Sequence, residues 1–542
     1  MGITRRRFLV GAGTVGAASV LGVRARPSFA ANAGKPVEAR SLITCTAQFD
    51  PVRPQIARLI DQACKRIGFS LTANPIEYND GIQKVFMQHD FDAYVVRLSG
   101  TAIRIDPNVF IYQVHDSSQY KKGGLNFTGY SNPALDKLAE AQQTEMDLNK
   151  RRDLVFKAQA LIDHDQPEHV IVNPMMTNAY RSDRIANLVP LTGEGIGSFW
   201  TDINMTVLKG NGYVRTGATS PLKNLNPVSV IDTIEFEELR MIYDRLMRIT
   251  PNGTPQPWAA KSVKLVNPTT IDMVLRGGMK FHDGKPVTAE DVKFSFDFQK
   301  QYAAPFFNAA LKKLRKIEIT GRHAMRFHLS EPYAPVFVAL FSSMFILPRH
   351  IWKDVPAKGD PLTYANENPI GSGPFKFDHW NRGEELKVSA FKEHFHPPKV
   401  AGVIRITYGS HDAMAAAIER GECDRTRYIL EPSLMDEVNK VKGCVGKAFP
   451  SHGWYDFAFN HKVAPFNDPA IRRALQYVVP TELIRDAVLR GYATSGGSVI
   501  GPANKFWHDP SVKPAHQDIA KAKQILAKAG YTWEGGKLHY PA

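Results

Sequence analysis

Apolar residues recur at helical spacing in several separate stretches of the chain. Over residues 54–67, Ile56, Leu59, Ile60 and Ala63 follow the i, i+3, i+4, i+7 pattern, and Gly68 ends the stretch. Similar patterns predict helices over about 148–163, 234–246, 412–420 and 518–529. Helix starts are also marked by capping residues, which are Asn132 before Pro133, Thr288 before Ala289, and Asp468 before Pro469.

Short apolar runs between these helices predict strands. Residues 91–96 and 169–172 are such runs, and a Gly/Pro-rich loop at 369–375 leads into another strand. Because helices and strands alternate along the chain, we expect α/β layers with largely parallel sheets. The polar, Gly-rich region 192–212 is a candidate domain boundary.

Composition places the chain among folded proteins with large cores. Of its 542 residues, 43% are hydrophobic and 22% are charged, which excludes a disordered chain, a collagen, a coiled coil and a small disulfide scaffold. The length predicts several domain-sized units.

The first 30 residues resemble a twin-arginine (Tat) export signal. Residues 4–9 read TRRRFL, residues 8–23 are uncharged, and residues 28–30 offer small residues for cleavage near Ala30. We therefore expect a periplasmic protein. Removal of this segment takes away five arginines and lowers the formal charge from +15 to +10. That modest excess affects solubility and steering, and we expect no nucleic-acid partner.

Motifs for catalysis or metal binding are scarce. The sequence contains no GxSxG, HExxH, P-loop or CxxC motif. Its four cysteines allow either disulfides or buried thiols, and Cys64 lies beside an apolar helix face, which favours a core thiol. His394 and His396 have no third ligand nearby in the sequence, so a solvated loop is favoured there over a metal site.

Several segments together resemble the oligopeptide/dipeptide (family 5) solute-binding proteins of ABC importers. The most specific is residues 275–292, LRGGMKFHDGKPVTAEDV. Others in the same order are YDRL at 243–246, PWA at 257–259, PIGSGPF at 369–375, GECD at 421–424, PFND at 465–468 and RRAL at 472–475. The resemblance covers 206–542 and implies an α/β fold of the two-lobed, type II periplasmic-binding-protein class with an extra subdomain.

Residues 37–205 resemble the C-terminal part of the same family, although here they come first. FTGYSNP at 127–133 and the helix at 55–68 carry this match. The order indicates a circularly permuted chain, with the family's usual ends joined near 200–210 and new ends near Ser41 and Tyr540. An accidental fusion of two partial modules is the alternative, disfavoured because the two parts make one family chain without duplication.

The resemblance implies a division into lobes. We expect one lobe at 181–235 and 365–457 with the extra subdomain at 236–364, and the other lobe at 37–180 and 458–542. A solute held between them favours the closed state, which a membrane permease then reads. The implied protein is a monomer without enzymatic activity, cofactor or metal. Its partners are a small peptide or peptide-like solute and the membrane subunits of an ABC permease.

The resemblance also suggests ligand-binding residues. Peptide-binding members hold the ligand's α-amine with an Asp that would fall near Ile103, where this chain has no acid and Arg104 follows. This departure points to a solute with an anionic group, which an Arg binds through a bidentate fork. The alternatives are that Arg104 faces solvent or pairs with Asp106. The other candidates, for which core packing is a comparable possibility, are Arg97, Tyr78, Trp454 and Tyr455.

Two other classes of function remain open from the sequence. One is a Tat-exported enzyme or metal-binding protein on the same scaffold, with His394, His396 or Asp424 in its site. The other is a receptor or chaperone-like module that presents a ligand to a partner protein. Tightly held metal in the purified protein would favour the first, and a neighbouring permease gene would argue against the second.

Overall fold

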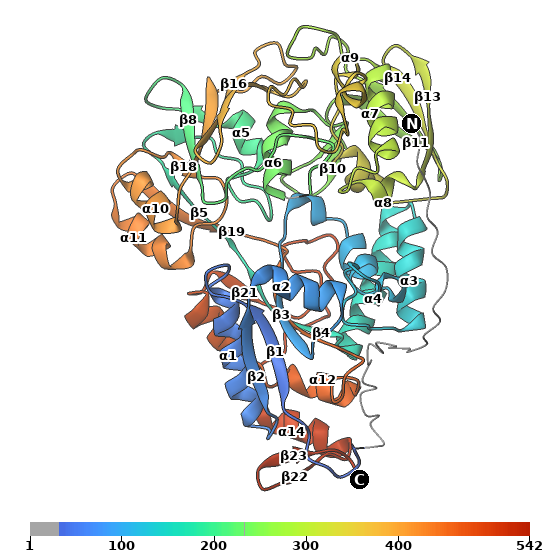
Figure 1. The fold of residues 1–542 in the computed structure, drawn as a ribbon, viewed down its shortest axis with the longest axis vertical. Coiled ribbons are helices and arrows are strands. Elements are labelled where there is room, and N and C mark those ends of the chain that lie inside the picture. Colours follow the sequence, from blue (N-terminus) through green and yellow to red (C-terminus); the bar gives the residue numbers. More distant parts are fainter. Residues whose placement is uncertain (1–31, 232) are drawn as a thin grey trace, which may run out of the picture.

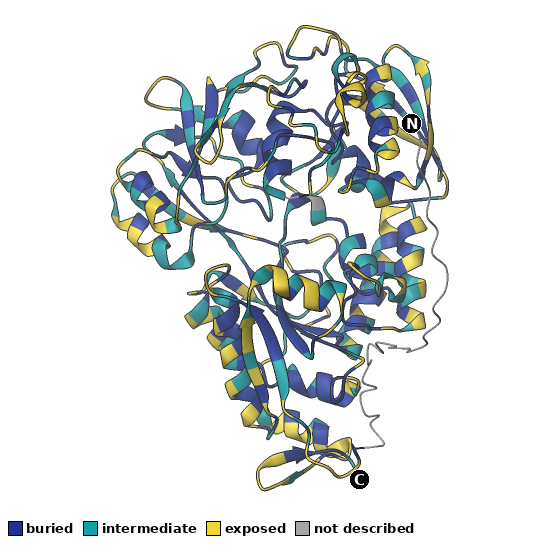
Figure 2. Ribbon diagram, viewed as in Figure 1, coloured by how far each residue is buried: buried dark blue, intermediate teal, exposed yellow. Residues whose placement is uncertain are grey.

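A computed structural model describes residues 32–231 and 233–542, and the expected export signal at 1–30 lies outside the described residues. The described chain forms two lobes, each built on its own mixed sheet (Figure 1). We call them the lower lobe (residues 32–174 and 454–542) and the upper lobe (residues 176–449). Buried residues follow the sheets of both lobes, and exposed residues cover the outer faces of the helices (Figure 2).

The lower lobe has a six-stranded sheet in the order β2-β1-β3-β20-β4-β21. Its strands are β1 (Arg40–Cys45), β2 (Leu71–Ile76), β3 (Ala93–Leu98), β4 (Glu168–Pro174), β20 (Trp454–Phe459) and β21 (Ala493–Ser495). Its helices are α1 (Val52–Lys65), α2 (Tyr78–Ile82), α3 (Pro133–Thr144), α4 (Leu148–Asp165), α12 (Pro469–Leu475), α13 (Thr481–Leu483) and α14 (Ile519–Lys528). One core joins α1 and α14 across strands from both ends of the chain.

The upper lobe has a seven-stranded sheet in the order β15-β16-β17-β8-β18-β5-β19. Its strands are β5 (Met176–Arg181), β8 (Tyr213–Ala218), β15 (Phe375–Asn381), β16 (Glu385–Ala390), β17 (Gly402–Thr407), β18 (Arg425–Thr426) and β19 (Cys444–Phe449). With them lie β6 (Ile185–Ala186), β7 (Thr206–Val207), α5 (Phe199–Asn204), α6 (Thr233–Ile242), α10 (His411–Glu419) and α11 (Met435–Lys440).

A four-stranded antiparallel sheet, β11-β12-β14-β13, extends the upper lobe. This part comprises β9 (Met247–Ile249), β10 (Pro255–Pro257), β11 (Ala260–Asn267), β12 (Thr270–Leu275), α7 (Ala289–Gln301), α8 (Asn308–Leu311), β13 (Leu314–Gly321), β14 (Ala324–Leu329) and α9 (Arg349–Trp352). It shares one continuous core with the rest of the upper lobe.

The chain passes between the two large sheets twice, once from β4 to β5 and once from β19 to β20. Only Met175 separates the first pair of strands, and residues 450–453 separate the second. Strand β5 belongs to the upper sheet, and the whole of β20 belongs to the lower sheet. The chain therefore crosses between the lobes a few residues earlier than the expected boundaries at 180/181 and 457/458.

The predicted helices and caps are largely present. Helix α1 covers most of the stretch predicted at 54–67, beginning two residues earlier and ending at Lys65, and Asn132 and Asp468 cap α3 and α12 through their side chains. Thr288 and Asp291 form a capping box at the start of α7.

Two expectations about the fold are wrong. The sheets are not largely parallel, because short turns join consecutive strands such as β13–β14 and β15–β16 into antiparallel hairpins. Nor is region 192–212 a boundary between domains. It contains α5, whose Phe199, Trp200 and Ile203 are buried in the core of the upper lobe.

Segments from near the two ends of the described chain lie side by side in the lower lobe. The backbone N–H of Val37 donates to the carbonyl of Leu538 at 2.8 Å, and that of Tyr540 donates to Lys35 at 2.9 Å. The Tyr540 hydroxyl donates to the Glu38 carboxylate at 2.7 Å. The expectation that residues near Ser41 and Tyr540 lie close together in one lobe is confirmed.

All four cysteines are buried, unpaired thiols, and Cys64 lies in the lower core as expected. Burial raises the pKa of the Cys423 thiol to about 12. Over the described ranges, no helix is both long and apolar enough to cross a membrane.

Candidate functional site

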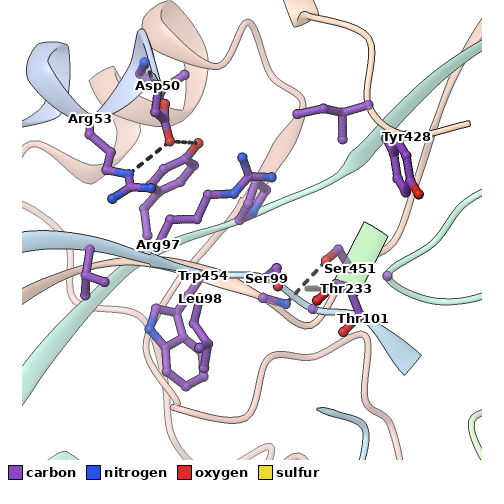
Figure 3. Close-up of a pocket in the computed structure, with 18 of the residues that line it drawn as sticks. Asp50, Arg53, Arg97, Leu98, Ser99, Thr101, Thr233, Tyr428, Ser451 and Trp454 are labelled. Atoms are coloured by element: carbon purple, nitrogen blue, oxygen red, sulfur yellow. Dashed lines mark hydrogen bonds and ion pairs between the residues drawn. The ribbon is translucent and has the colours of Figure 1, made fainter. Parts of the chain in front are cut away.

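A cavity of about 860 Å³ lies between the two lobes. Its lower wall consists of the end of β3 with the loop that follows, the start of α1, and β20. Its upper wall consists of residues after β8, the start of α6 and the loop after β18. Figure 3 shows Arg97 and Ser99 of the lower lobe and Thr233 and Tyr428 of the upper lobe around the same space. A molecule enclosed there would contact both lobes.

The lobes are in contact around this cavity. Ala102 and Ile105, from the loop after β3, are buried in the core of the upper lobe. The backbone N–H of Ala334 in the upper lobe donates to the carbonyl of Gln143 in the lower lobe at 2.7 Å. The two lobes are therefore in direct contact.

All five residues proposed from the sequence line this one cavity. They are Tyr78, Arg97, Arg104, Trp454 and Tyr455. They come from three separated parts of the chain, and the pairing of β3 with β20 places Arg97 opposite Tyr455.

Arg104 faces the cavity without a carboxylate partner in the described chain. Its Nη1 donates to the backbone carbonyl of Ser99 at 3.1 Å and to the Ser99 hydroxyl. Asp106, the alternative partner considered from the sequence, is held instead by Arg151 through two bonds of 2.6 and 2.8 Å. Burial lowers the pKa of Arg104. A half-buried cation without a counter-charge favours binding of an anion.

Arg97 is a second cation without a carboxylate. Its guanidinium lies 5.4 Å from the ring centre of Tyr455, and the described residues offer it no hydrogen bond or ion pair. The nearby Asp50 accepts hydrogen bonds from Arg53 at 3.0 Å and from the Tyr455 hydroxyl at 3.3 Å. Figure 3 shows the Arg97 side chain extending into the space between the Asp50–Arg53 pair and Tyr428.

The remaining candidates form apolar parts of the wall. Tyr78 stacks on Phe49 with ring centres 3.8 Å apart. Trp454 is buried and packs against Phe110 at 4.8 Å, so it serves the core of the lower lobe as well as the cavity.

The sequence interpretation missed the acids that line the cavity, among them Asp456, Glu168 and Glu237. Asp456 and Glu168 lie on adjacent strands β20 and β4, and both are buried. Burial first, and then the neighbouring Glu168, raise the pKa of Asp456 well above its usual range. In the upper lobe, burial and the charge of Glu194 raise the pKa of Glu237 to about 8. A lone acid inside an apolar strand, such as Asp456 in WYDFAF, was the available signal.

The residues considered for a metal site have other partners. The imidazole of His394 lies 3.2 Å from the Asp244 carboxylate, and its other nitrogen lies 2.9 Å from the carbonyl of His396. Asp424 forms ion pairs with Arg184 and Arg215 at 3.0 and 2.9 Å. Across residues 32–231 and 233–542, no group of three or more His, Cys, Asp or Glu side chains is placed to hold a metal.

Comparison with known families adds a match over more than half of the chain. The model described as "Bacterial extracellular solute-binding proteins, family 5 Middle" matches residues 254–540. The chain belongs to family 5 of the bacterial extracellular solute-binding proteins. The family 5 resemblance proposed from residues 206–542 is thereby confirmed.

Individual family 5 proteins resemble the chain over part of its length. Oligopeptide-binding protein AppA of Bacillus subtilis is 27% identical over 298 residues, 54% of each chain. Glutathione-binding protein GsiB of Shigella flexneri is 26% identical over 322 residues, which are 58% of this chain and 60% of GsiB. The chain thus spans little more than half the length of these relatives in the matches.

A solved structure shares the fold. The periplasmic oligopeptide-binding protein of Thermotoga maritima has a TM-score of 0.50 and 22% identity, and the match covers 59% of this chain and 63% of that protein. The architecture is therefore the type II periplasmic-binding-protein fold of the oligopeptide-binding class, as expected.

Proposed function

We propose that the protein captures a small peptide or peptide-like solute with an anionic group between its lobes and delivers it to an ABC permease. The observation that carries the proposal is the pair of cavity-lining arginines, Arg97 and Arg104, which have no carboxylate partner in the described chain. Closure around an anion would supply the missing counter-charge from the solute.

Closure is the mechanism that this arrangement supports. The solute would touch β3 and β20 in the lower lobe and α6 in the upper lobe. Since only a closed protein makes both sets of contacts, the solute favours that state by its differential affinity. The two crossings, at Met175 and 450–453, would act as the hinge. No step changes the solute chemically, and the protein acts as a monomer without a cofactor.

We further propose that the chain is a circular permutation of the family fold, divided into lobes with the extra subdomain at 236–364. The adjacency of residues 34–38 and 538–541 supports this proposal. So does the family match, which begins at residue 254 and omits the earlier segment that resembles the family's C-terminal part. The exposed turn at 209–212, between β7 and β8, would be the place where the family's usual ends are joined.

We place the protein in the periplasm, exported by the twin-arginine pathway. The TRRRFL segment and the family's extracellular character support this location.

The test of the proposed function is the identity of the bound solute. Mass spectrometry of denatured protein, purified from its native periplasm, should reveal a stoichiometric small molecule with a carboxylate or another anionic group. Adding that molecule back to stripped protein should reduce the radius of gyration measured by small-angle scattering. A bound solute that lacks any anionic group would contradict the assignment of the two arginines, and an unchanged radius would contradict closure.

A further inference from the structure

A second, much smaller cavity lies in the upper lobe beside the first. It has a volume of about 30 Å³, enough for a single small particle. Three buried arginines line it, Arg240, Arg245 and Arg248, which are 4%, 5% and 3% exposed. Glu194, Glu237 and the lower-lobe residue Thr101 also line it.

The three guanidiniums have more donors than the described protein has acceptors for them. None of their Nε atoms has a hydrogen-bond partner among the described residues. Arg240 binds the Glu194 carboxylate at 2.7 Å. Arg245 has no ion pair in the described chain and donates only to the backbone carbonyls of Ser342 and Phe236, at 3.2 and 3.5 Å.

The positive charge of Arg248 is nearly as poorly balanced by neighbouring carboxylates as that of Arg245. Its Nη2 donates to the carbonyl of Arg240 at 3.0 Å and lies 3.9 Å from the Asp244 carboxylate. That carboxylate is already bonded by the Trp258 indole at 2.8 Å and lies 3.2 Å from His394. Burial lowers the pKa of Arg248 to about 9 and that of Arg245 well below its usual range.

Arg245 is the least compensated of the three arginines. The small cavity is lined by two acids, Glu194 and Glu237; Arg240 binds Glu194, and burial together with Glu194 raises the pKa of Glu237 to about 8. Among the described residues, the buried guanidinium of Arg245 therefore has no carboxylate partner. An uncompensated buried cation is costly, and an anion beside it removes that cost.

We propose that this small cavity, lined by Arg240, Arg245 and Arg248, binds one small monovalent anion of halide size. The volume of the cavity and the unused guanidinium N–H groups fit such an ion.

The position of this anion site couples it to closure of the lobes. Its arginines belong to the upper lobe, but Thr101 and Ala102 of the lower lobe complete its lining. Opening of the lobes would remove that part of the wall. By linkage, an anion that binds the closed form more tightly also raises the affinity for the solute. This coupling rests on the proposed closure mechanism, whereas the anion site itself does not.

The direct experiment is crystallographic, with bromide as the probe. Crystals of the full protein grown in sodium bromide should show an anomalous scattering peak beside Arg245, at full occupancy. Crystals of an Arg245→Met variant should lack the peak, and those of an Arg58→Met variant, which changes an exposed arginine on α1, should keep it. A water without anomalous signal at that place in the wild type would overturn the anion site.

A solution experiment covers the case in which Arg245→Met does not fold. At constant ionic strength, sodium bromide should raise the melting temperature of the wild type above its value in sodium gluconate. The gain should be larger at pH 6 than at pH 9, because loss of the Glu237 proton adds a competing negative charge. A Glu237→Gln variant should keep the bromide gain at both pH values. Equal melting in both salts would contradict the proposal.

Other charged and titratable groups near the three arginines also act on this pH dependence. They are Glu194, Asp202, Glu238, Asp244, His394, Arg427 and Tyr428. Glu237→Gln isolates the contribution of Glu237 from theirs. If bromide binds but does not alter the affinity for the co-purified solute, the anion site stands and its coupling to closure fails.

Discussion

At the residue scale, the feature that defines the cavity is a cation placed where an acid was expected. Arg104 lies beside the position where an acidic anchor was expected, and among the described residues its side chain donates hydrogen bonds only to Ser99. Truncating one side of a buried charge-assisted pair typically costs about 2–5 kcal/mol. Arg104→Ala should therefore weaken binding of the co-purified solute by at least roughly tenfold, since about 1.4 kcal/mol is one decade. Arg104→Lys should recover part of this loss, because it keeps the charge without the fork.

Calorimetric titration measures these affinities. Melting of the stripped protein should barely change in either variant, and the stabilisation by solute should shrink with affinity. Arg58→Ala, at an exposed position on α1, is the matched control. Equal affinity across all the variants would place Arg104 outside the site and favour an ordinary free-amine peptide.

Glu237 should make the stability of the stripped protein depend on pH. Its folded pKa of about 8 lies above the ordinary 4.5. Between these values the folded state binds a proton that the unfolded state has released, so stability falls as pH rises, by at most about 1.4 kcal/mol per pH unit. Glu237→Gln should flatten this slope in urea unfolding between pH 5 and 8. An unchanged slope, or an equal effect of Glu140→Gln at an exposed position, would contradict this assignment.

At the element scale, helix α4 anchors the loop that carries Arg104. Arg151 on α4 holds Asp106 through two bonds and also donates to Gln142. Both partners are buried, and removing one member of such a pair typically costs about 3–5 kcal/mol. Arg151→Met should therefore lower the free energy of unfolding in urea by about that amount.

A double variant tests whether this loss comes from the pair. Adding Asp106→Asn to Arg151→Met should cost less than the sum of the single changes, because the buried acid is no longer left unpaired. Lys150→Met, at an exposed position one residue earlier, should have little effect. Additive losses would mean that the two side chains contribute independently.

The N-terminal segment should act as a twin-arginine signal. Changing Arg5, Arg6 and Arg7 together to Lys keeps the charge but removes the arginines that the pathway recognises. The protein should then be absent from the periplasmic fraction and keep its full-length mass in whole cells, whereas wild type should be cleaved near Ala30. An undiminished periplasmic yield of the variant would refute the assignment.

Elements with local signals were predictable, and pairings between distant segments were not. Helix α1 has its apolar spacing, and helices α3 and α7 have their N-terminal caps, within a few consecutive residues. The direction of strand pairing depends on partners far along the chain, as when β20 pairs with β3 and β4, so the mixed sheets were missed.

The same distinction applies to the site. Arg104 was found because a family motif fixed its position, and Asp456 was missed because its partner Glu168 is nearly 300 residues away. The group of arginines around the small cavity is brought together by packing, and no sequence pattern marks it.

At the scale of the whole molecule, the order of the two blocks can be reversed experimentally. A gene that joins residue 541 to residue 34 by a short Gly/Ser linker and opens the chain between Gly210 and Asn211 restores the family order. The backbone N–H of Gly34 already donates to the carbonyl of Pro541 at 3.1 Å, and the new opening lies in an exposed turn, so both changes are sterically mild.

The reordered protein should have the circular dichroism spectrum and solute affinity of the original chain. Its sequence should also match AppA and GsiB over nearly their full lengths. A control opened inside β17, in the middle of the upper sheet, should not fold. Failure of the reordered protein to fold, or a match no longer than before, would contradict the permutation.

The adjacency of residues 34–38 and 538–541 in the lower lobe has a practical consequence for optical sensors. Fluorescent proteins attached near these two segments would both be fixed to the lower lobe. Because the distance between them would not change when the lobes close, energy transfer between them would not report closure. A donor inserted in the turn at 209–212 of the upper lobe, with an acceptor after residue 541, would span the hinge. A sensor that reports closure of this chain thus needs at least one internal insertion.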